Sequence, residues 1–175
     1  IFLYLHCNPN DSLGYNLEQI ATQAGLVKNV DYSFSAKEIT PIEELNELYN
    51  CLSIYISTAT GGGWELTVTE AMACGIPCII PKHSSFIELG ANNRAVFLEE
   101  LDLFCNDVEE STLRYRICVE EAAEKMLDCY KEYAAANDLN QFVKAGENAL
   151  NWINTLTWTE INKSWIEVFK TIFKL

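Results

Sequence analysis

Residues Ser57–Pro81 read STATGGGWELTVTEAMACGIPCIIP, and this stretch decides the fold of the chain. Its glycine cluster at residues 61–63 permits backbone conformations closed to other residues and leaves room for a ligand against the main chain. Thr67 and Glu70 have the spacing of a capping box, which predicts a helix ending at Cys74–Gly75, and the apolar residues after it predict a buried strand. Because unpaired amides at a helix start attract anions, the loop and helix form a candidate seat for a diphosphate.

Strand and helix patterns alternate on both sides of this stretch. The strand patterns lie at residues 1–5, 30–34, 52–56, 77–80 and 95–98. Helical spacing of apolar residues recurs between them, at residues 17–24 and from about Pro41 to Tyr49. The alternation predicts an α/β fold, a Rossmann-like parallel sheet with helices on both faces. Ligands bind beyond the carboxyl ends of such strands, which are the loops at residues 6–10, 35–37, 58–66 and 82–85.

The chain changes character after about residue 105, where the patterns predict only helices. Apolar residues between Val119 and Ala134 fall on one helical face, and further helices are expected at residues 142–153 and 161–172. We therefore expect a Rossmann-like core over residues 1–105 and C-terminal helices over residues 106–175, packed together as one domain.

The composition argues against several classes of partner and site. The chain has 12 basic and 25 acidic residues, and this net charge of −13 argues against nucleic acid or an anionic membrane as the main partner. Seven cysteines without a CxxC pair favour a reduced, cytoplasmic compartment, and the spacing of Cys74 and Cys78 does not favour a metal site. No apolar run approaches the roughly 20 residues of a membrane span. Because the chain begins at Ile1 inside a predicted strand, we expect it to be part of a longer protein.

The glycine-rich segment also resembles a known family. Residues 61–81, GGGWELTVTEAMACGIPCIIP, are similar to the nucleotide-sugar-binding segment of retaining glycosyltransferases of the GT-B architecture, in which a Glu, seven residues and a second Glu are followed by AMACGxPV. The likeness is strong at residues 57–88 and weak over most of the remaining chain. It implies that the chain is the C-terminal, donor-binding half of a GT-B fold, without the first strand of that half.

The resemblance assigns roles within the loop and helix. Glu70 matches the second Glu, which holds the ribose hydroxyls of the donor. Gly62 stands where the first Glu contacts the donor sugar, and Glu65, three residues away, is the candidate catalytic replacement. The amides from Gly63 to Thr67 are assigned to the diphosphate, and loop 35–37 to the base. The candidate donor-binding residues are Gly62, Gly63, Trp64, Glu65, Leu66, Thr67 and Glu70.

The resemblance also implies what the chain requires from outside. The donor is a nucleotide sugar, a UDP- or GDP-hexose, and neither a metal nor another cofactor is expected. The Arg and Lys with which this family grips the donor diphosphate lie one strand earlier and are not in this chain. The partner is an N-terminal Rossmann-like half that supplies the acceptor site. We therefore expect hexose transfer to an acceptor hydroxyl in the parent enzyme and no activity in this fragment alone.

Other functions and plainer structural roles fit the same residues. Glycine at position 62 is also compatible with a non-catalytic nucleotide-sugar-binding or scaffold module, and epimerases and phosphorylases share the architecture. The glycine cluster can serve only as a turn, and Trp64 only as a packing anchor. His83 can be an exposed loop residue and Glu88 a helix-surface residue.

Overall fold

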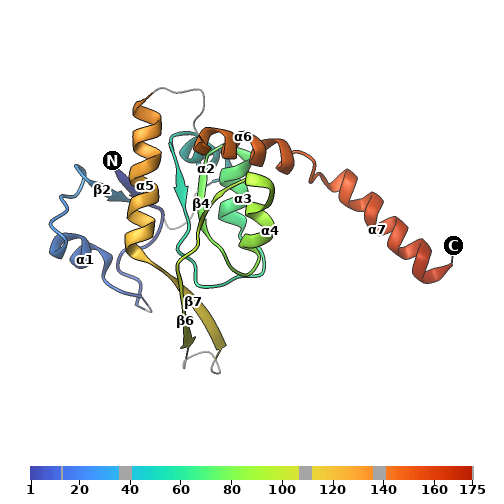
Figure 1. Cartoon of the computed structure of the whole chain (residues 1–175), viewed down its shortest axis with the longest axis horizontal. Coiled ribbons are helices and arrows are strands. Elements are labelled where there is room, and N and C mark those ends of the chain that lie inside the picture. Colours follow the sequence, from blue (N-terminus) through green and yellow to red (C-terminus); the bar gives the residue numbers. More distant parts are fainter. Residues whose placement is uncertain (13, 36–40, 107–111, 136–140, 175) are drawn as a thin grey trace. The chain divides into compact units, whose positions relative to one another are not determined.

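The computed structural model describes residues 1–12, 14–35, 41–106, 112–135 and 141–174 (Figure 1). The chain forms two compact units, Ile1–Leu45 and Asn46–Leu175. Parallel pairing of short strands occurs within each unit, and the strands alternate with helices as predicted. The candidate site lies entirely in the second unit, so that unit is described in more detail.

The first unit contains two parallel strands and a helix. β1 (Leu3–Leu5) pairs with β2 (Tyr32–Phe34). α1 (Leu17–Gln23) begins after Asn16, whose side chain accepts a hydrogen bond from the Gln19 amide at 2.9 Å. It ends before Gly25, whose φ of +79° is the left-handed geometry expected at a helix end. The predicted strand and helix segments at residues 1–5, 17–24 and 30–34 are therefore confirmed in shorter form.

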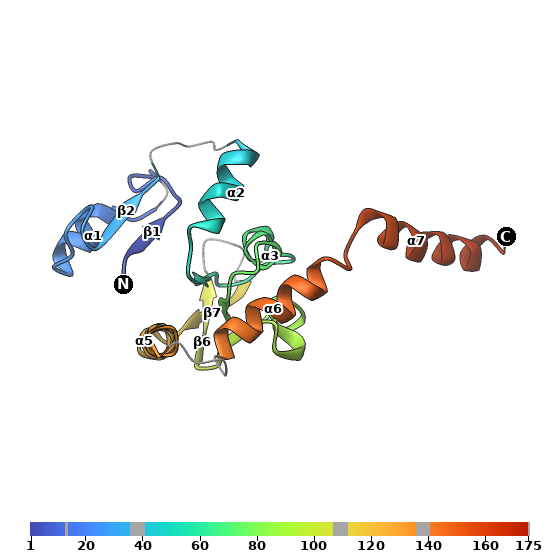
Figure 2. The ribbon, with the colours of Figure 1, turned by 90° about the horizontal axis from the view of Figure 1, so that it is seen from above.

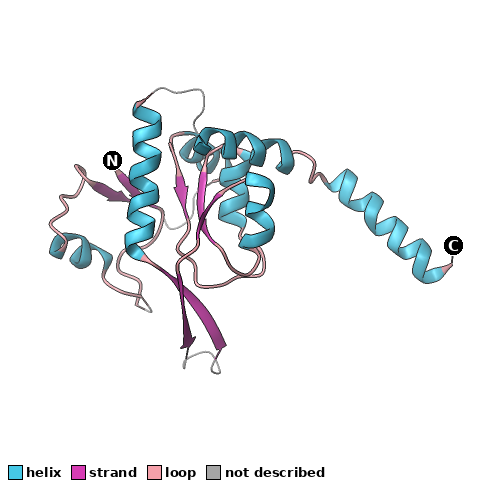
Figure 3. Ribbon diagram, viewed as in Figure 1, coloured by secondary structure: helices cyan, strands magenta, loops and turns pink. Residues whose placement is uncertain are grey.

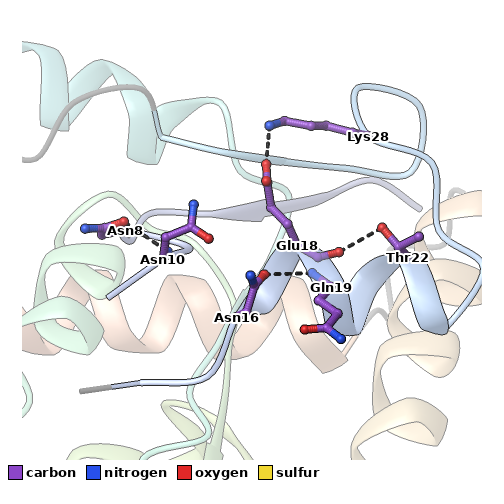
Figure 4. A network of polar contacts seen from close by, with 7 residues as sticks. All are labelled: Asn8, Asn10, Asn16, Glu18, Gln19, Thr22 and Lys28. Atoms are coloured by element: carbon purple, nitrogen blue, oxygen red, sulfur yellow. Dashed lines mark hydrogen bonds and ion pairs between the residues drawn. The ribbon is translucent and has the colours of Figure 1, made fainter. Parts of the chain in front are cut away.

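Polar side chains on α1 and the neighbouring loops make local contacts in this unit (Figure 4). The Lys28 ammonium pairs with the Glu18 carboxylate, and the Thr22 hydroxyl donates to the Glu18 carbonyl oxygen at 2.9 Å. The backbone amide of Asn10 donates to Asn8 Oδ1 at 3.0 Å. Residues 36 and 37 of the loop assigned to the nucleotide base lie outside the described residues.

The second unit is built on a parallel sheet in the order β3-β4-β5. Figure 3 shows the strands in magenta and the helices in cyan. The strands of this sheet are β3 (Tyr55–Ile56), β4 (Cys78–Pro81) and β5 (Val96–Leu98). The helices before and between them are α2 (Ile42–Asn50), which spans the boundary between the units, α3 (Leu66–Ala73), α4 (Phe86–Gly90) and the short 3-10 helix η1 (Ala91–Asn93). β4 lies in the middle of the sheet and all of it is buried, as expected for a central parallel strand.

Helices cover both faces of this sheet. Ile79 of β4 packs in a buried cluster with side chains from α5 (Val119–Ala134) and α6 (Gln141–Ile153). The other buried members of that cluster are Leu98, Ala122, Cys129 and Phe142. On the opposite face, Ile80 lies beside α4, since a Cβ added to Gly90 would stand 3.2 Å from Ile80 Cδ1. The predicted layering of helices about a parallel sheet is therefore confirmed.

α6 packs closely against the turn that follows α3 (Figure 2). Cys74 caps α3 and Gly75 follows at φ +72°, so the predicted end of this helix is confirmed. A Cβ added to Gly146 of α6 would stand only 2.5 Å from the Gly75 carbonyl oxygen. Glycine at position 146 therefore allows the backbone of α6 to touch the turn of the AMACG motif.

A β-hairpin corrects the sequence analysis, which predicted only helices after about residue 105. β6 (Leu101–Asn106) and β7 (Thr112–Ile117) are antiparallel, with Leu101 opposite Ile117. Arg114 and Arg116 alternate with apolar neighbours at a period of two residues, which is a strand pattern. The amphipathic helical pattern begins at Val119 as predicted, but the prediction of helices alone after about residue 105 was wrong.

The three C-terminal helices lie where the apolar spacing predicts them. α7 (Trp158–Phe173) begins after Thr157, whose hydroxyl accepts from the Glu160 amide at 3.3 Å. None of its residues is buried, in contrast to α5 and α6. Within the described ranges, no helix combines the length and the apolar character that crossing a membrane requires.

Candidate functional site

The loop between β3 and α3 leads directly into the helix, but the helix starts earlier than the capping box predicts. α3 begins at Leu66 with Glu65 as its N-cap residue, and the Glu65 side chain makes no capping bond. Thr67 lies inside the first turn, where its Oγ1 accepts a hydrogen bond from the Tyr55 hydroxyl at 2.8 Å. The predicted Thr67–Glu70 capping box is therefore wrong, because both side chains bond to neighbouring elements instead of to the start of α3.

Glu70 points from α3 toward a buried tyrosine of α2. Its Oε2 accepts a hydrogen bond from the Tyr49 hydroxyl at 2.8 Å, and the Tyr49 side chain is only 6% exposed. Burial, together with the Glu70 carboxylate, raises the pKa of Tyr49, so its hydroxyl remains a donor at neutral pH. Tyr49 thus fixes one carboxylate oxygen of Glu70 and leaves the other with acceptor capacity. Tyr49 was predicted only as a helix residue, and its contact with Glu70 was missed.

The Glu65 carboxylate stands beside the backbone of Gly62. A Cβ added to Gly62 would lie 1.8 Å from Glu65 Oε1, so the side chain of Glu65 fills the space that a side chain at position 62 would enter. The Gly62 carbonyl oxygen accepts a hydrogen bond from the Ser85 hydroxyl at 3.2 Å, which ties the glycine loop to the loop after β4. The structure therefore brings a carboxylate to position 62 although that residue is glycine.

The other predicted loop residues have open surroundings. A Cβ added to Gly63 would meet no atom within 4 Å beyond its chain neighbours, and Leu66 is exposed. Trp64 is 42% exposed, and its ring lies 6.5 Å from that of Trp152 in α6. Gly63 and Leu66 are thus exposed near the start of α3, and the Trp64 ring lies next to α6.

His83 is buried between the glycine loop and the hairpin. Its side chain is 3% exposed, and Nε2 donates to the Ala59 carbonyl oxygen at 3.2 Å because a carbonyl can only accept. Its ring stacks on Tyr115 of β7, with centroids 5.0 Å apart and planes at 17°. Nδ1 is buried without a hydrogen-bond partner among the described residues. The interpretation of His83 as an exposed loop residue is therefore wrong.

The hairpin itself reaches the glycine loop. The Tyr115 amide donates to the Thr60 carbonyl oxygen at 3.1 Å. A Cβ added to Gly61 would lie 2.8 Å from Arg114 Nη1, so a guanidinium lies over the bare backbone of that glycine. Neither residue was predicted at the site, because helix was expected there, although the period of two over residues 112–117 is a strand signal.

Stability should fall in mildly acidic solution because of His83. Burial lowers the pKa of His83, partly offset by the Ala59 hydrogen bond and the charge of Glu65. The unfolded chain therefore takes up a proton first as the pH falls, so the free energy of unfolding should be constant above about pH 7 and should decline below about pH 6.5. Urea unfolding between about pH 7.5 and about pH 5.5 measures this slope. His83→Gln should flatten it and His6→Gln should not, and an equal slope in both variants would contradict the assignment.

Two further features lie outside this arrangement. Glu88 is exposed on α4, which fits its interpretation as a helix-surface residue. A cavity of about 540 Å³ is lined by β5, α5 and α6 rather than by the glycine loop, with Phe97, Glu121 and Lys144 among its residues. Among the described residues, no three metal-ligating side chains come together as a cluster that could hold an ion.

Comparisons with known proteins agree with the geometry. The family described as Glycosyl transferases group 1 matches residues 14–111, which is more than half of the chain. Uncharacterized protein 356 of Sulfolobus islandicus rod-shaped virus 1 is 23% identical over 135 residues, covering 75% of this chain and 36% of that protein. The chain thus spans about a third of the length of this curated relative.

Two solved structures share the fold. One is the C-terminal domain of LpcC, a glycosyl transferase group 1 family protein from Francisella tularensis, with a TM-score of 0.53, 20% identity, and coverage of 80% of this chain and 60% of that chain. The other is a GtfA/B complex, with a TM-score of 0.53, 12% identity, and coverage of 98% of this chain and 36% of that chain. The chain therefore belongs to the glycosyl transferases group 1 family, and its fold is that of the C-terminal domain of a GT-B glycosyltransferase.

Proposed function

We propose that this chain is the donor-binding half of a retaining glycosyltransferase, which moves a hexose from a UDP- or GDP-sugar to an acceptor hydroxyl. The observation that carries the proposal is the carboxylate of Glu70, held by the buried Tyr49 hydroxyl at 2.8 Å on the helix that follows the glycine loop. A carboxylate with one oxygen fixed and the other able to accept suits the paired hydroxyls of a ribose.

The start of α3 supports a place for the diphosphate in this proposal. The first amides of a helix have no intrahelical acceptor and carry the positive end of the helix dipole. Here they include the amides of Leu66 and Thr67, which follow a loop whose backbone is open at Gly63. These amides would bind the diphosphate, with the ribose toward Glu70, as at other helix starts that hold phosphates.

Glu65 is the proposed contact for the donor sugar. Its carboxylate lies beside Gly62, where the resemblance expects the first Glu of the motif. In the parent enzyme, the amides would stabilise the departing diphosphate and the carboxylate would position the sugar. These two effects would make the main contributions to the rate. The acceptor site would be supplied by an N-terminal Rossmann-like half, so we propose that this chain alone has no transferase activity.

A non-catalytic binding module is the second candidate, and glycine at position 62 is the observation that favours it. The two candidates make opposite predictions for Gly62→Glu in a protein that includes the N-terminal half. The new side chain would displace Glu65, because the space is already filled. An enzyme that relies on Glu65 should lose turnover, whereas a decayed enzyme should gain it. Product analysis would establish whether the anomeric configuration is retained.

Donor binding should depend on Glu70 and, more weakly, on Tyr49. Glu70→Ala should weaken the binding of the matching nucleoside diphosphate by about 1.5–3 kcal/mol, the value of a charged hydrogen bond. Tyr49→Phe should cost about 0.5–1.5 kcal/mol, because the carboxylate stays but loses its fixed position. Calorimetric titration of the chain with UDP, GDP and their hexose conjugates measures both effects.

Tyr55→Phe is the matched control for the tyrosine variant. It removes the same atom from a neighbouring tyrosine whose hydroxyl bonds to Thr67 instead of Glu70, at the same distance of 2.8 Å. Its donor affinity should stay within about twofold of the unmodified chain, a change of less than about 0.5 kcal/mol. Unchanged affinity in Glu70→Ala would remove the ribose assignment, and equal losses in the two tyrosine variants would show that the Tyr49–Glu70 hydrogen bond has no specific role in donor binding.

A further inference from the structure

Arg114 of β7 lies against the glycine loop although 53 residues separate it from Gly61 in the sequence. A Cβ added to Gly61 would stand 2.8 Å from Arg114 Nη1 and 3.5 Å from its Cδ. The guanidinium is therefore laid along the main chain at the residue before Gly62, which is itself flanked by the Glu65 carboxylate. Two neighbouring glycines thus leave room for two side chains of opposite charge.

The hairpin that carries Arg114 is anchored on both sides of the candidate site. The backbone of Tyr115 donates to Thr60 at 3.1 Å, and its ring stacks on His83 at 5.0 Å. His83 in turn donates to Ala59 at 3.2 Å. These contacts join β7 to the loop before α3 and to the loop after β4. Arg114 is therefore presented by a braced strand, which limits the conformational entropy lost when it binds a ligand.

An anionic ligand at this loop requires a nearby cation. The chain has a net charge of −13, and Glu65 and Glu70 both lie at the candidate site. The structure places the guanidinium of Arg114 directly over the glycine loop.

We infer that Arg114 is a binding residue for the diphosphate of the donor, supplied by the β6–β7 hairpin. The inference rests on the proposed function, because it takes the ligand at the start of α3 to be a phosphate ester. A guanidinium has five donors in a planar fork, so it can bind a phosphate through two parallel hydrogen bonds while another edge contacts the protein. The helix amides and Arg114 would then share the charge of the diphosphate, and Arg114 would stabilise it as the leaving group.

Inorganic pyrophosphate is the probe that isolates this contact from the nucleoside. The experiment titrates the chain with pyrophosphate, UDP and GDP by calorimetry, for the unmodified chain and for four variants. Arg114→Gln should weaken pyrophosphate binding roughly 10- to 100-fold, and should weaken the matching nucleotide by a similar factor. Arg114→Lys keeps the charge but loses the planar fork, so its loss should be less than about 10-fold.

Arg116→Gln is the matched control, since it makes the same charge change two residues along the same strand. The Arg116 guanidinium lies 4.8 Å from the centre of the Phe104 ring, across the hairpin. The affinity of the Arg116→Gln variant for pyrophosphate should stay within about twofold of that of the unmodified chain, because a distant, screened charge has only a weak effect. Circular dichroism and the unfolding midpoint of each variant show that the hairpin variants are folded.

Glu70→Ala, the fourth variant, separates this inference from the proposed function. It should lower the affinity for the nucleotide and should not lower that for pyrophosphate, because pyrophosphate has no ribose. Equal pyrophosphate affinities in Arg114→Gln and Arg116→Gln would overturn the role of Arg114, even where Glu70→Ala still lowers nucleotide binding and so supports the donor site. No saturable pyrophosphate binding by the unmodified chain would overturn it too. If Glu70→Ala leaves nucleotide affinity unchanged and Arg114→Gln lowers it, the result would support this inference and reject the ribose assignment.

Discussion

Replacing Phe142 with alanine should lower the free energy of unfolding by about 3–5 kcal/mol, the usual loss for a buried phenylalanine. The Phe142 side chain is 0% exposed and packs in the cluster that joins the first turn of α6 to Ile79 of β4 and Leu98 of β5. Alanine would leave a cavity between the sheet and two helices, and the surrounding strands cannot collapse freely into it. Urea unfolding followed by far-UV circular dichroism measures the change.

The neighbouring residue provides the control for this variant. Val143 lies on the same turn of α6 and is 38% exposed, so Val143→Ala should cost less than about 1 kcal/mol. Domains of this size are stable by only about 5–15 kcal/mol, so the loss expected for the Phe142 variant is a large fraction of the total. Equal losses in the two variants would mean that α6 is not held to the sheet through Phe142.

Local signals explain why much of the second unit was predictable. Residue spacing, or a glycine with its backbone freedom, is enough to predict several elements from the sequence. These are the buried strand β4, the end of α3 at Cys74–Gly75, and the helices α5, α6 and α7. The family resemblance rests on the same segment, and the family and fold comparisons confirm it. The predicted division of the chain at residue 105 stays a prediction.

Long-range contacts explain what was missed. Tyr49 precedes Glu70 by 21 residues, and nothing in the periodicity of α2 shows that its hydroxyl points at α3. The capping box failed for a related reason, because the Thr67 hydroxyl is satisfied by Tyr55 of the adjacent strand rather than by the helix start. Spacing alone describes an isolated helix, whereas these two side chains respond to their neighbours in the folded unit.

The hairpin shows how one wrong assignment hides a candidate site residue. Because only helices were predicted after about residue 105, Arg114 was given no role, and the Arg and Lys with which the family grips the donor diphosphate were expected to lie outside this chain. Successive side chains of a strand such as β7 point to opposite faces. β7 pairs with β6, and both Arg114 and Tyr115 of β7 contact the glycine loop. The proposed diphosphate contact became visible only with that pairing.

Arg94→Met should lower the free energy of unfolding by about 2–4 kcal/mol, because Arg94 is a buried hub between α4 and α6. Its side chain is 7% exposed, and it donates to the carbonyl oxygens of Leu89 and Glu88 at the end of α4. Its guanidinium also lies 4.0 Å from the centre of the Trp152 ring. Methionine keeps most of the volume but removes the donors to both carbonyls, of which Glu88 still accepts from the Ala91 amide, and the loss of the stacked cation adds to the cost. Release of the buried charge offsets part of the loss.

Arg116→Met tests whether burial and not arginine chemistry causes this effect. Arg116 also lies over an aromatic ring, at 4.8 Å from Phe104, but it is exposed on the hairpin, so its loss should stay within about 0.5 kcal/mol. Urea unfolding of both variants compares them directly. Because the Trp152 ring also lies 6.5 Å from Trp64, the Arg94 variant should additionally alter the tryptophan fluorescence of the folded state. A destabilised variant with unchanged fluorescence would show that Arg94 holds the end of α4 without supporting Trp152, and equal stability losses in the two arginine variants would reject the buried hub.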